Sequence, residues 1–218
     1  MIVVDRLYKY FDGGLVKALN GISLEVCKGE ACSIMGPSGS GKSTLLNLIG
    51  ALDIPTDGEI HIDGTRLKDK GSLARYRNRQ VGFVFQFHNL IPNITLVENV
   101  ELPTYTMPGM TRSGRREKAM KLLSEVGLEK RADFLPTKVS GGERQRAAVA
   151  RALINSPKII LADEPTGSVD SETAAFIMLA ILERCRNDHM TALIVSHDKD
   201  IASQAGRTLF MRDGQLID

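Results

Sequence analysis

The sequence predicts an α/β fold with a mostly parallel sheet, an added antiparallel β portion and a helical insertion. Two observations carry this prediction. Short runs of β-forming residues alternate with helical patterns through much of the chain, which is typical of a parallel sheet covered on both faces. Between Asn89 and Ala150 this alternation stops, and prolines and helical patterns replace it.

The expected strands fall into two groups. Ile22–Val26 and Glu59–Asp63 alternate apolar and polar residues, as strands with one exposed face do. Apolar runs indicate four buried strands, at Ala31–Met35, Val81–Phe85, Lys158–Ala162 and Thr191–Val195. The residues from Leu209 to Leu216 predict a final antiparallel hairpin that turns at Asp213-Gly214.

The helical insertion is expected to form part of one domain that covers residues 1–218. The α/β core with its antiparallel portion would comprise 1–88 and 151–218, and the helical subdomain 89–150. Helical patterns run over Arg112–Val126 and Glu143–Leu153, while Pro92, Pro103, Pro108 and Pro136 interrupt the segment.

Composition excludes several classes of protein. Of the 218 residues, 43% are apolar and 25% charged, which is enough apolar material for a core and excludes general disorder. A net charge of +2 argues against a dedicated nucleic-acid binder. The longest apolar run, Ala174–Leu182, is far shorter than the roughly 20 residues of a membrane-spanning helix. Met1–Asp5 gives no sign of a secretory signal.

The three cysteines are expected to be buried free thiols. Cys27, Cys32 and Cys185 form no metal-binding or redox motif, because Cys27 and Cys32 are five positions apart. Sparse, odd-numbered cysteines with apolar neighbours are typical of a reducing compartment, where the thiol packs as a small hydrophobe.

A complete phosphate-binding loop follows the strand at Ala31–Met35. The segment from Gly36 to Ser43 matches G-x-x-x-x-G-K-[ST], and a helix is expected over Lys42–Gly50. Glycines let several backbone N–H groups converge on one phosphate, and the helix N-terminus adds a favourable field. Lys42 would reach the β- and γ-phosphates and Ser43 would bind Mg²⁺. The sequence therefore predicts a phosphate-loop NTPase core whose ATP-binding residues are Gly36, Pro37, Ser38, Gly39, Ser40, Gly41, Lys42, Ser43 and Thr44. The alternative is a glycine-rich turn without a ligand.

An acidic pair ends a second buried strand. Asp163 and Glu164 follow Lys158–Ala162, at the edge of a parallel sheet where ligands bind. Asp163 is expected to orient Mg²⁺ through water, and Glu164 to orient and deprotonate the water that attacks the γ-phosphate. The alternative is an acidic pair that only solvates the strand end.

Together with four further segments, these motifs resemble the nucleotide-binding subunit of ABC transporters. Gln86 matches the Q-loop, Val139-Ser140-Gly141-Gly142-Glu143 the signature, Ser168-Val-Asp170 the D-loop, and Val195-Ser-His197-Asp the switch histidine, while Tyr10 takes the place of the adenine-stacking aromatic. Tyr8 and Phe11 compete with Tyr10 for that role. The resemblance covers nearly the whole chain, and several segments are similar to the lipoprotein-releasing and macrolide-efflux branch.

The signature departs from Leu-Ser-Gly-Gly-Gln at two positions. Val139 replaces Leu, and Glu143 replaces Gln. The lipoprotein-releasing and macrolide-efflux branch tolerates Glu at the second of these positions, so we do not interpret Glu143 as inactivating.

The resemblance implies a hydrolytic mechanism that needs two copies of the chain. Glu164, His197 and Gln86 would be catalytic, and Ser43, Gln86 and Asp163 would hold Mg²⁺. Two copies would pack head to tail around ATP, so that Ser140, Gly141, Gly142 and Glu143 complete the partner's site while Ser168 and Asp170 couple the dimer. His61, His88 and His189 match no catalytic position.

The resemblance also implies a permease partner at the cytoplasmic face of the plasma membrane, with export or lipoprotein extraction as the function. Its contact is expected within 87–106, at Leu90, Ile91, Leu96 and Leu102; the alternative is insertion core, because Leu96 and Val100 have helical spacing. Two other functions are weighed. Soluble ABC proteins of translation or DNA repair usually carry two cassettes or a long coiled coil, and a phosphate-loop kinase would lack the signature and switch histidine.

Overall fold

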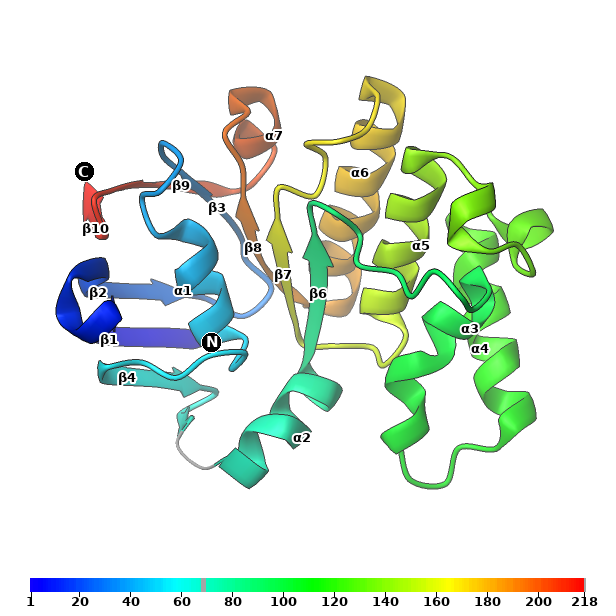
Figure 1. Ribbon diagram of the computed structural model, residues 1–218, viewed down its shortest axis with the longest axis horizontal. Helices are drawn as coiled ribbons and strands as arrows, with labels where there is room; N and C mark the ends of the chain where they lie inside the picture. The colour runs from blue at the N-terminus through cyan, green and yellow to red at the C-terminus, as the bar shows by residue number, and fades with distance from the viewer. Residues whose placement is uncertain (68–69, 218) are drawn as a thin grey trace.

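The computed structural model describes residues 1–67 and 70–217, in which two sheets and their covering helices form an α/β molecule (Figure 1). The larger sheet has the strand order β10-β9-β3-β8-β7-β6. Its strands are β3 (Ala31–Met35), β6 (Val81–Phe85), β7 (Ile159–Asp163), β8 (Thr191–Val195), β9 (Arg207–Arg212) and β10 (Gln215–Ile217). β10 pairs antiparallel with β9, and the other neighbours are parallel. The predicted parallel sheet and final hairpin are confirmed.

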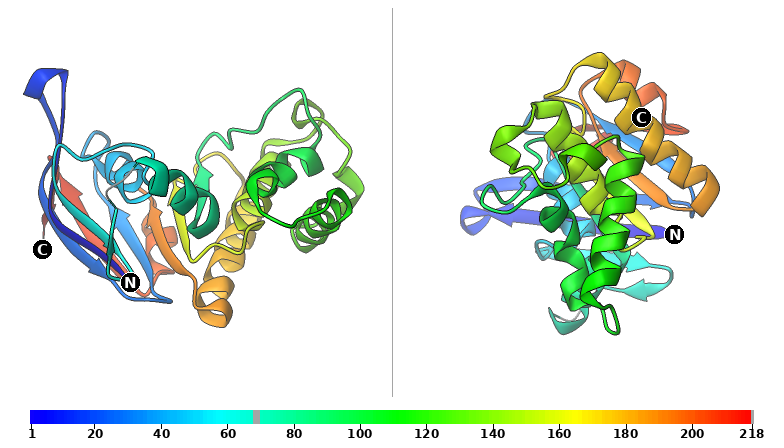
Figure 2. Two further views of the ribbon diagram at one scale, coloured as in Figure 1. Left: turned by 90° about the horizontal axis from the view of Figure 1, so that it is seen from below. Right: turned by 90° about the vertical axis from the view of Figure 1, so that its right-hand side faces the viewer.

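The smaller sheet is antiparallel and has the strand order β2-β1-β4-β5. It contains β1 (Ile2–Phe11), β2 (Val16–Val26), β4 (Asp57–Ile62) and β5 (Thr65–Arg66). The turn between β1 and β2, which includes the 3₁₀ turn η1 (Asp12–Gly14), extends beyond the rest of the molecule (Figure 2). The antiparallel portion is therefore confirmed, and it is larger than the two strands predicted for it.

The central strands are apolar along their whole length because each contributes side chains to two hydrophobic clusters. Ile160 of β7 and Ile194 of β8 belong to the cluster that the helical part completes. Their neighbours Leu161 and Leu193 belong to the other cluster, with α1 and the smaller sheet. Alternation between two buried faces is what makes such strands continuous apolar runs.

Helices cover both faces of the larger sheet (Figures 1 and 2). The α-helices are α1 (Lys42–Ile49), α2 (Lys70–Gln80), α3 (Leu96–Glu101), α4 (Arg112–Glu125), α5 (Gly141–Leu153), α6 (Ser171–Asp188) and α7 (Lys199–Ser203). Three 3₁₀ turns, η2 (Leu102–Thr106), η3 (Glu129–Arg131) and η4 (Pro136–Lys138), connect the helices of the insertion. Among the described helices, none combines the length and apolar character that crossing a membrane requires.

The segment 89–150 is helical as predicted, and in the described chain no strand falls within it. It has no core of its own, because Leu96 and Leu123 pack in one cluster with Val84 and Ile160 of the sheet. α5 also runs through residue 150 and ends at Leu153. The helical segment therefore shares one hydrophobic cluster with the larger sheet, and the division into core and helical subdomain stays a prediction.

The prediction that all three cysteines are buried is wrong for Cys27. Cys32 and Cys185 are buried, and burial raises the pKa of the Cys185 thiol to about 11. Cys27 is exposed because it follows the end of β2, where the chain turns at the surface toward β3.

Candidate active site

Four of the predicted motifs leave the larger sheet from a single row of paired residues. Ile34 of β3 pairs with Val195 of β8, Val195 pairs with Asp163 of β7, and Asp163 pairs with Phe85 of β6. The phosphate loop, the switch segment, Glu164 and Gln86 begin within one or two residues of that row. Parallel strands therefore bring these motifs to one edge, where ligands of α/β sheets bind.

The phosphate loop follows a course that glycine alone allows at two points. Gly36 and Gly41 have φ angles of 156° and 100°. A Cβ at Gly36 would overlap the carbonyl oxygen of Met211, and one at Gly41 would overlap that of Ala18. Both glycines are thus required by close backbone approach as well as by conformation.

Lys42 places a cation inside the loop. Its Nζ donates hydrogen bonds to the carbonyl oxygens of Gly36 and Pro37, both at 2.8 Å, and lies 3.4 Å from Ser40 Oγ. Among the described residues, no carboxylate lies within ion-pairing distance of Lys42. Gly41 is the N-cap of α1 and provides no side-chain cap. An ammonium group beside uncapped N–H groups is a donor set that fits a polyphosphate.

Glu164 and His197 form a pair at the same edge. Glu164 Oε1 lies 2.9 Å from His197 Nδ1, and the carboxylate side chain is 15% exposed while the imidazole is 71% exposed. Glu164 has a φ of 47°, an uncommon conformation for a non-glycine residue. Its backbone N–H donates to the carbonyl of Val195 at 3.0 Å, which fixes the turn. A strained acid held against an accessible imidazole is typical of a functional site.

The D-loop contacts the Q-loop through one side chain. Ser168 Oγ donates to the carbonyl oxygen of Gln86 at 3.1 Å. Asp170 instead caps α6, accepting from the backbone N–H and the hydroxyl of Thr173, both at 2.9 Å. The N–H of Thr173 is the main cause that lowers the pKa of the Asp170 carboxyl. The two predicted coupling residues therefore have distinct local contacts within one chain.

The metal residues predicted from sequence include a single carboxylate. Among the described residues, no group of three or more His, Cys, Asp or Glu side chains could hold a metal ion. Ser43 is exposed in the first turn of α1, and Asp163 ends β7. A set of one hydroxyl, one amide and one carboxylate fits Mg²⁺ that is held largely by phosphate and water.

Tyr10 lies on β1, which pairs with the strand whose backbone abuts the phosphate loop. It pairs with Lys17 of β2, the residue before Ala18, whose carbonyl abuts Gly41. Lys17 Nζ is 6.0 Å from the centroid of the Tyr10 ring. Tyr8 turns toward Gly21, and a Cβ at that glycine would meet the Tyr8 hydroxyl. Of the two tyrosines, Tyr10 is therefore the one whose ring is not committed to packing on β2 backbone.

The signature residues begin α5. Ser140 is the N-cap, and it forms a reciprocal capping box with Glu143: Ser140 N–H donates to Glu143 Oε2 at 2.7 Å, and Glu143 N–H to Ser140 Oγ at 3.1 Å. These hydrogen bonds, together with the Arg131 guanidinium, lower the pKa of the Glu143 carboxyl. α5 lies on the opposite side of β8, β7 and β6 from α1 (Figure 1). One chain thus keeps its signature apart from its own phosphate loop.

Sequence reasoning did not identify the buried polar contacts that join these segments. Gln145 is 1% exposed, and its Nε2 donates to the carbonyl oxygens of Phe85 and Pro165. Arg144 and Arg151 of the same helix contact His88. The sequence gives no signal for these contacts, because a glutamine between two arginines is usually exposed and only the fold shows that Gln145 is buried.

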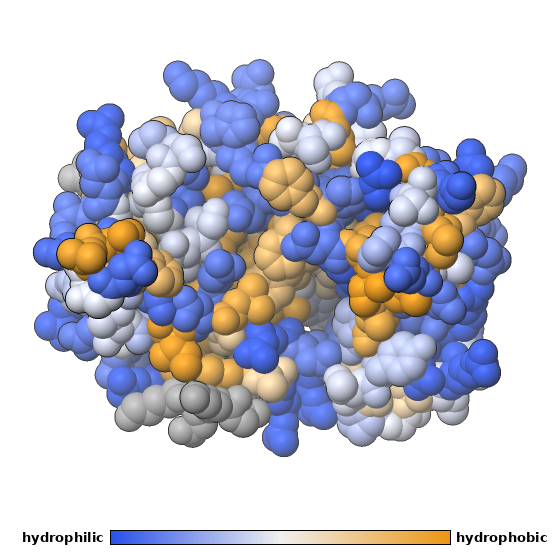
Figure 3. Space-filling model, in the orientation of Figure 1, coloured by the Kyte–Doolittle hydropathy of each residue, from blue (hydrophilic) through white to orange (hydrophobic). Residues whose placement is uncertain are grey.

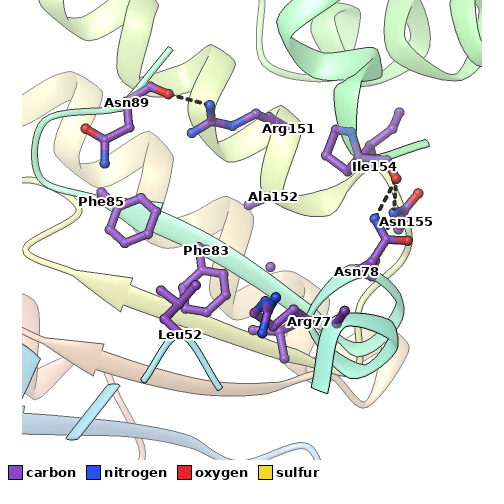
Figure 4. Close-up of a pocket in the computed structure, with 14 residues that line it drawn as sticks. Leu52, Arg77, Asn78, Phe83, Phe85, Asn89, Arg151, Ala152, Ile154 and Asn155 are labelled. Atoms are coloured by element: carbon purple, nitrogen blue, oxygen red, sulfur yellow. Dashed lines mark hydrogen bonds between the residues drawn. The ribbon is translucent and has the colours of Figure 1, made fainter. Parts of the chain in front are cut away.

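A cavity of about 420 Å³ opens between the sheet and the helical lobe, with residues such as Phe83, Phe85 and Arg151 at its wall (Figure 4). Apolar side chains gather along the middle of this face (Figure 3). Of the residues predicted for permease contact, Ile91 and Leu102 are exposed and Leu90 is half-buried. The prediction of permease contact is wrong for Leu96, because this residue is fully buried. It belongs to the core, which is the alternative that its helical spacing with Val100 indicated.

A complete phosphate loop, an acid after the neighbouring strand and an adjacent histidine define a phosphate-loop nucleoside triphosphatase. The family is settled by comparison: residues 19–167 match the family model described as ABC transporter, and the chain belongs to this family. It is an ATP-hydrolysing subunit, the motor part of a membrane transport system.

Similar proteins carry related names. The chain is 45% identical to the lipoprotein-releasing system ATP-binding protein LolD of Bacteroides fragilis, with all of both chains covered. It is also 45% identical to the ABC transporter ATP-binding protein YvrO of Bacillus subtilis, covering all of this chain and 96% of that one. Among solved structures, the dimeric ATP-binding cassette MJ0796 bound to ADP and Pi has a TM-score of 0.94 at 41% identity, covering 100% and 97% of the two chains.

Proposed function

We propose that two copies of this chain form a head-to-tail ATPase that drives a lipoprotein-releasing or related export system. The observation that carries the proposal is made at one edge of the larger sheet. There, Glu164, His197 and the start of the loop that carries Lys42 all lie within two residues of a single row of paired strand residues. Relatives named as lipoprotein-releasing subunits, at 42–45% identity, support the transport class.

Each residue of the edge has a proposed role. The loop from Gly36 to Thr44 binds the phosphates, with Lys42 as the cation that meets the β- and γ-phosphates. Glu164 accepts a proton from the attacking water, and His197 orients the water and the γ-phosphate. Tyr10 stacks on the adenine, and Ser43, Gln86 and Asp163 hold Mg²⁺, which would neutralise charge on the phosphates.

The second copy is proposed because one chain leaves its site incomplete. Ser140 and the N–H groups of Gly141 and Gly142 begin a helix of 13 residues, which makes their end of α5 suited to an anion. They lie across the sheet from the chain's own loop (Figure 1), so we infer that they meet the γ-phosphate on a partner copy. Ser168 and Asp170 would then transmit changes between the two sites.

The permease is proposed to dock over the cavity beside β6. Phe83 and Phe85 stack with centroids 5.5 Å apart, and the exposed Leu52 lines the cavity beside them. An apolar patch with polar edges is suited to a protein partner. A permease bound there would hold the chain at the cytoplasmic face of the membrane, and cargo recognition would belong to the permease.

Mixing two inactive variants tests the shared site. Ser140→Arg removes the signature contact, and Lys42→Ala removes the loop cation. In a head-to-tail mixed dimer, one site carries both changes and the other carries neither. We therefore expect each variant alone to be inactive and the mixture to regain part of the ATPase activity, measured as phosphate release across mixing ratios.

The control mixes Ser140→Arg with a chain altered at both positions, which cannot form an intact site. Mixed dimers are counted by differently tagged copies. Zero activity in the first mixture despite mixed dimers would contradict independent shared sites. Normal hydrolysis by Ser140→Arg as a monomer would contradict the two-copy mechanism altogether. Co-purification with a polytopic membrane protein distinguishes the transporter function from a soluble ABC ATPase.

A further inference from the structure

The segment that follows Gln86 is tied to the signature helix by two arginines of α5. Arg144 Nε donates to His88 Nε2 at 2.6 Å. Arg151 donates to the two carbonyl oxygens that follow, to His88 O at 2.7 Å and to Asn89 O at 2.6 Å. Both guanidinium groups therefore contact His88, Arg144 through the imidazole and Arg151 through the backbone, and Arg151 also contacts the backbone of Asn89.

The backbone of these two residues is strained. His88 and Asn89 have φ angles of 49° and 47°, and two consecutive non-glycine residues in the left-handed region are uncommon. Such a conformation persists only where its surroundings hold it. The Arg151 hydrogen bonds to both carbonyls provide that support, and they do so from a helix whose other end carries the signature.

Arg144 connects His88 to the first residues of the signature. Its Nη1 donates to the carbonyl oxygen of Val139 at 2.7 Å and to that of Pro136 at 3.3 Å. Val139 directly precedes the N-cap Ser140. The chain of contacts thus runs from the Q-loop through the imidazole and the guanidinium to the carbonyl beside the signature serine.

The contact requires a neutral imidazole. Arginine has only donors and keeps its proton, so Nε2 of His88 must accept and the ring proton must be on Nδ1. Burial, followed by the charges of Arg144 and Arg151, lowers the pKa of His88 below its ordinary value of 6.5. The charged side chains whose fields act on His88 are these two arginines of α5. Within the described residues, neither arginine has a carboxylate partner.

We propose that His88 is a positioning residue, which as a neutral hydrogen-bond acceptor holds Arg144 and thereby fixes the signature end of α5 relative to Gln86. The inference rests on the proposed function and deepens it, because it assigns the link between the loop that begins at Gln86 and the surface that binds the partner's phosphate.

A pair of amide substitutions isolates the role of Nε2. In His88→Gln the amide oxygen lies at the distance of Nε2 from the backbone and can still accept from Arg144. In His88→Asn the amide is one bond shorter, at the position of Nδ1, and cannot reach it. His61→Asn, on β4 and away from the site, is the control for loss of an imidazole.

The full-length chain is measured in three ways: kcat and KM for ATP, ATP affinity of the monomer, and hydrogen exchange of the amides in the first turn of α5. His88→Asn is expected to lower kcat about tenfold and to speed exchange at α5, while monomer affinity for ATP stays within about twofold. His88→Gln is expected to keep the exchange rate and most of kcat.

Equal behaviour of the Gln and Asn variants would overturn the inference. Unfolding of both variants, seen as loss of a cooperative thermal transition, would mean that His88 is structural and would overturn it too. A different result would contradict the proposed function, namely that the unaltered chain has no ATPase activity. In that case the exchange rates of the two variants still decide whether His88 positions α5.

Discussion

Two helix N-termini in this molecule are candidate anion sites, and they are built in opposite ways. α1 begins at Gly41 with no side-chain cap, beside the Lys42 ammonium, so its donors are available to a ligand. α5 begins at Ser140 inside a complete capping box with Glu143, so part of its donor set is satisfied by its own chain. The N-terminus of α1 is therefore suited to holding a polyphosphate. The N-terminus of α5 is suited to contacting a polyphosphate through a surface that its own cap has already ordered.

This difference implies that the two helix ends contribute unequally to the free energy of ATP binding. Most of that free energy should come from α1, where uncapped N–H groups and a cation are free to contact the phosphates. A capped helix end adds a secondary contact, which matters once a partner approaches. Substitutions at the sheet edge should therefore act on binding and chemistry within one chain, whereas substitutions at α5 should act on association.

The largest expected effect is at the sheet edge. Glu164→Gln should lower kcat by a factor of about 10²–10⁴, because the amide keeps the shape of the carboxylate but cannot accept the proton of water. ATP affinity should be preserved, and the variant should accumulate as an ATP-bound dimer. Phosphate release gives kcat, and size-exclusion chromatography with and without ATP gives the association state.

Glu172→Gln provides the control for this change, since Glu172 is an exposed acid in the first turn of α6. It should hydrolyse ATP at the unaltered rate. If Glu164→Gln hydrolysed ATP at the rate of the unaltered chain, Glu164 would not be the base. The sheet edge would then not be shown to carry the chemistry, and only its role in binding would distinguish it from α5.

The next effect concerns binding. Lys42→Ala should weaken ATP affinity about 10- to 100-fold, because a charge-assisted contact to phosphate is lost and the neighbouring carbonyls of Gly36 and Pro37 lose their donor. Titration with a fluorescent ATP analogue measures the affinity. Lys28→Ala, in the exposed turn before β3, should bind as the unaltered chain does. Unchanged affinity in Lys42→Ala would place the phosphate elsewhere.

The sheet edge could be predicted from the sequence because each of its motifs is local. A strand, a glycine loop and a helix lie within 31–50, and β3, β6 and β8 begin and end where the apolar runs do. β1 was not predicted because a bulge breaks its alternation. Its pairing shifts between Val4 and Leu7, with Arg6 at a φ of 43°, so buried positions are not spaced by two. Among the side chains of α2 that the structure describes, few are buried, chiefly Leu73 and Tyr76, so the helix leaves no helical pattern in the sequence.

The contacts around α5 could not be predicted, because they join residues about 60 positions apart. Gln145 Nε2 reaches Phe85, and Arg144 reaches His88. No spacing rule relates a helix to a turn at that separation. The signature was found as a motif, but the way in which its helix is anchored to the Q-loop follows only from the fold.

A third prediction separates what α5 needs from what a ligand needs. Gly141 has no left-handed φ, and a Cβ there would meet its nearest neighbours at ordinary distances, Ser168 O at 3.8 Å and Arg144 Nη2 at 3.9 Å. The chain's own fold therefore does not require glycine at this position. Gly141→Ala should raise the free energy of unfolding by about 0.5 kcal/mol, since glycine is costly in a helix, yet lower ATPase activity several-fold by blocking the partner's phosphate.

Gly142→Ala is the matched comparison. Its Cβ would lie 3.0 Å from Thr173 Oγ1, so this substitution should disturb the start of α6 and lower the thermal stability of the monomer. Urea unfolding and phosphate release are measured on both variants. If Gly141→Ala hydrolysed ATP normally while being more stable, the surface at α5 would not approach a ligand, and the two helix ends would differ only in their caps.

The smallest effect is expected at Glu143, where the cap itself titrates. Its folded pKa is lowered chiefly by the N–H of Ser140, with a smaller contribution from Arg131, so the carboxylate stabilises the fold at pH values above its unfolded pKa of about 4.5. That contribution is lost as the pH falls through the lower, folded pKa, because protonation then occurs in both states.

The substitution Glu143→Gln keeps an acceptor for the Ser140 N–H, and solvent screens the ion pair with the half-exposed Arg131. This substitution should therefore lower the free energy of unfolding by only about 0.5 kcal/mol at pH 7.5. Glu143→Ala, which removes the acceptor, should cost about 1 kcal/mol. Urea unfolding at pH 7.5 and pH 4 measures both. The difference between the unaltered chain and Glu143→Gln should shrink at pH 4, and a difference that stayed constant would mean that the charge of Glu143 does not contribute to the cap.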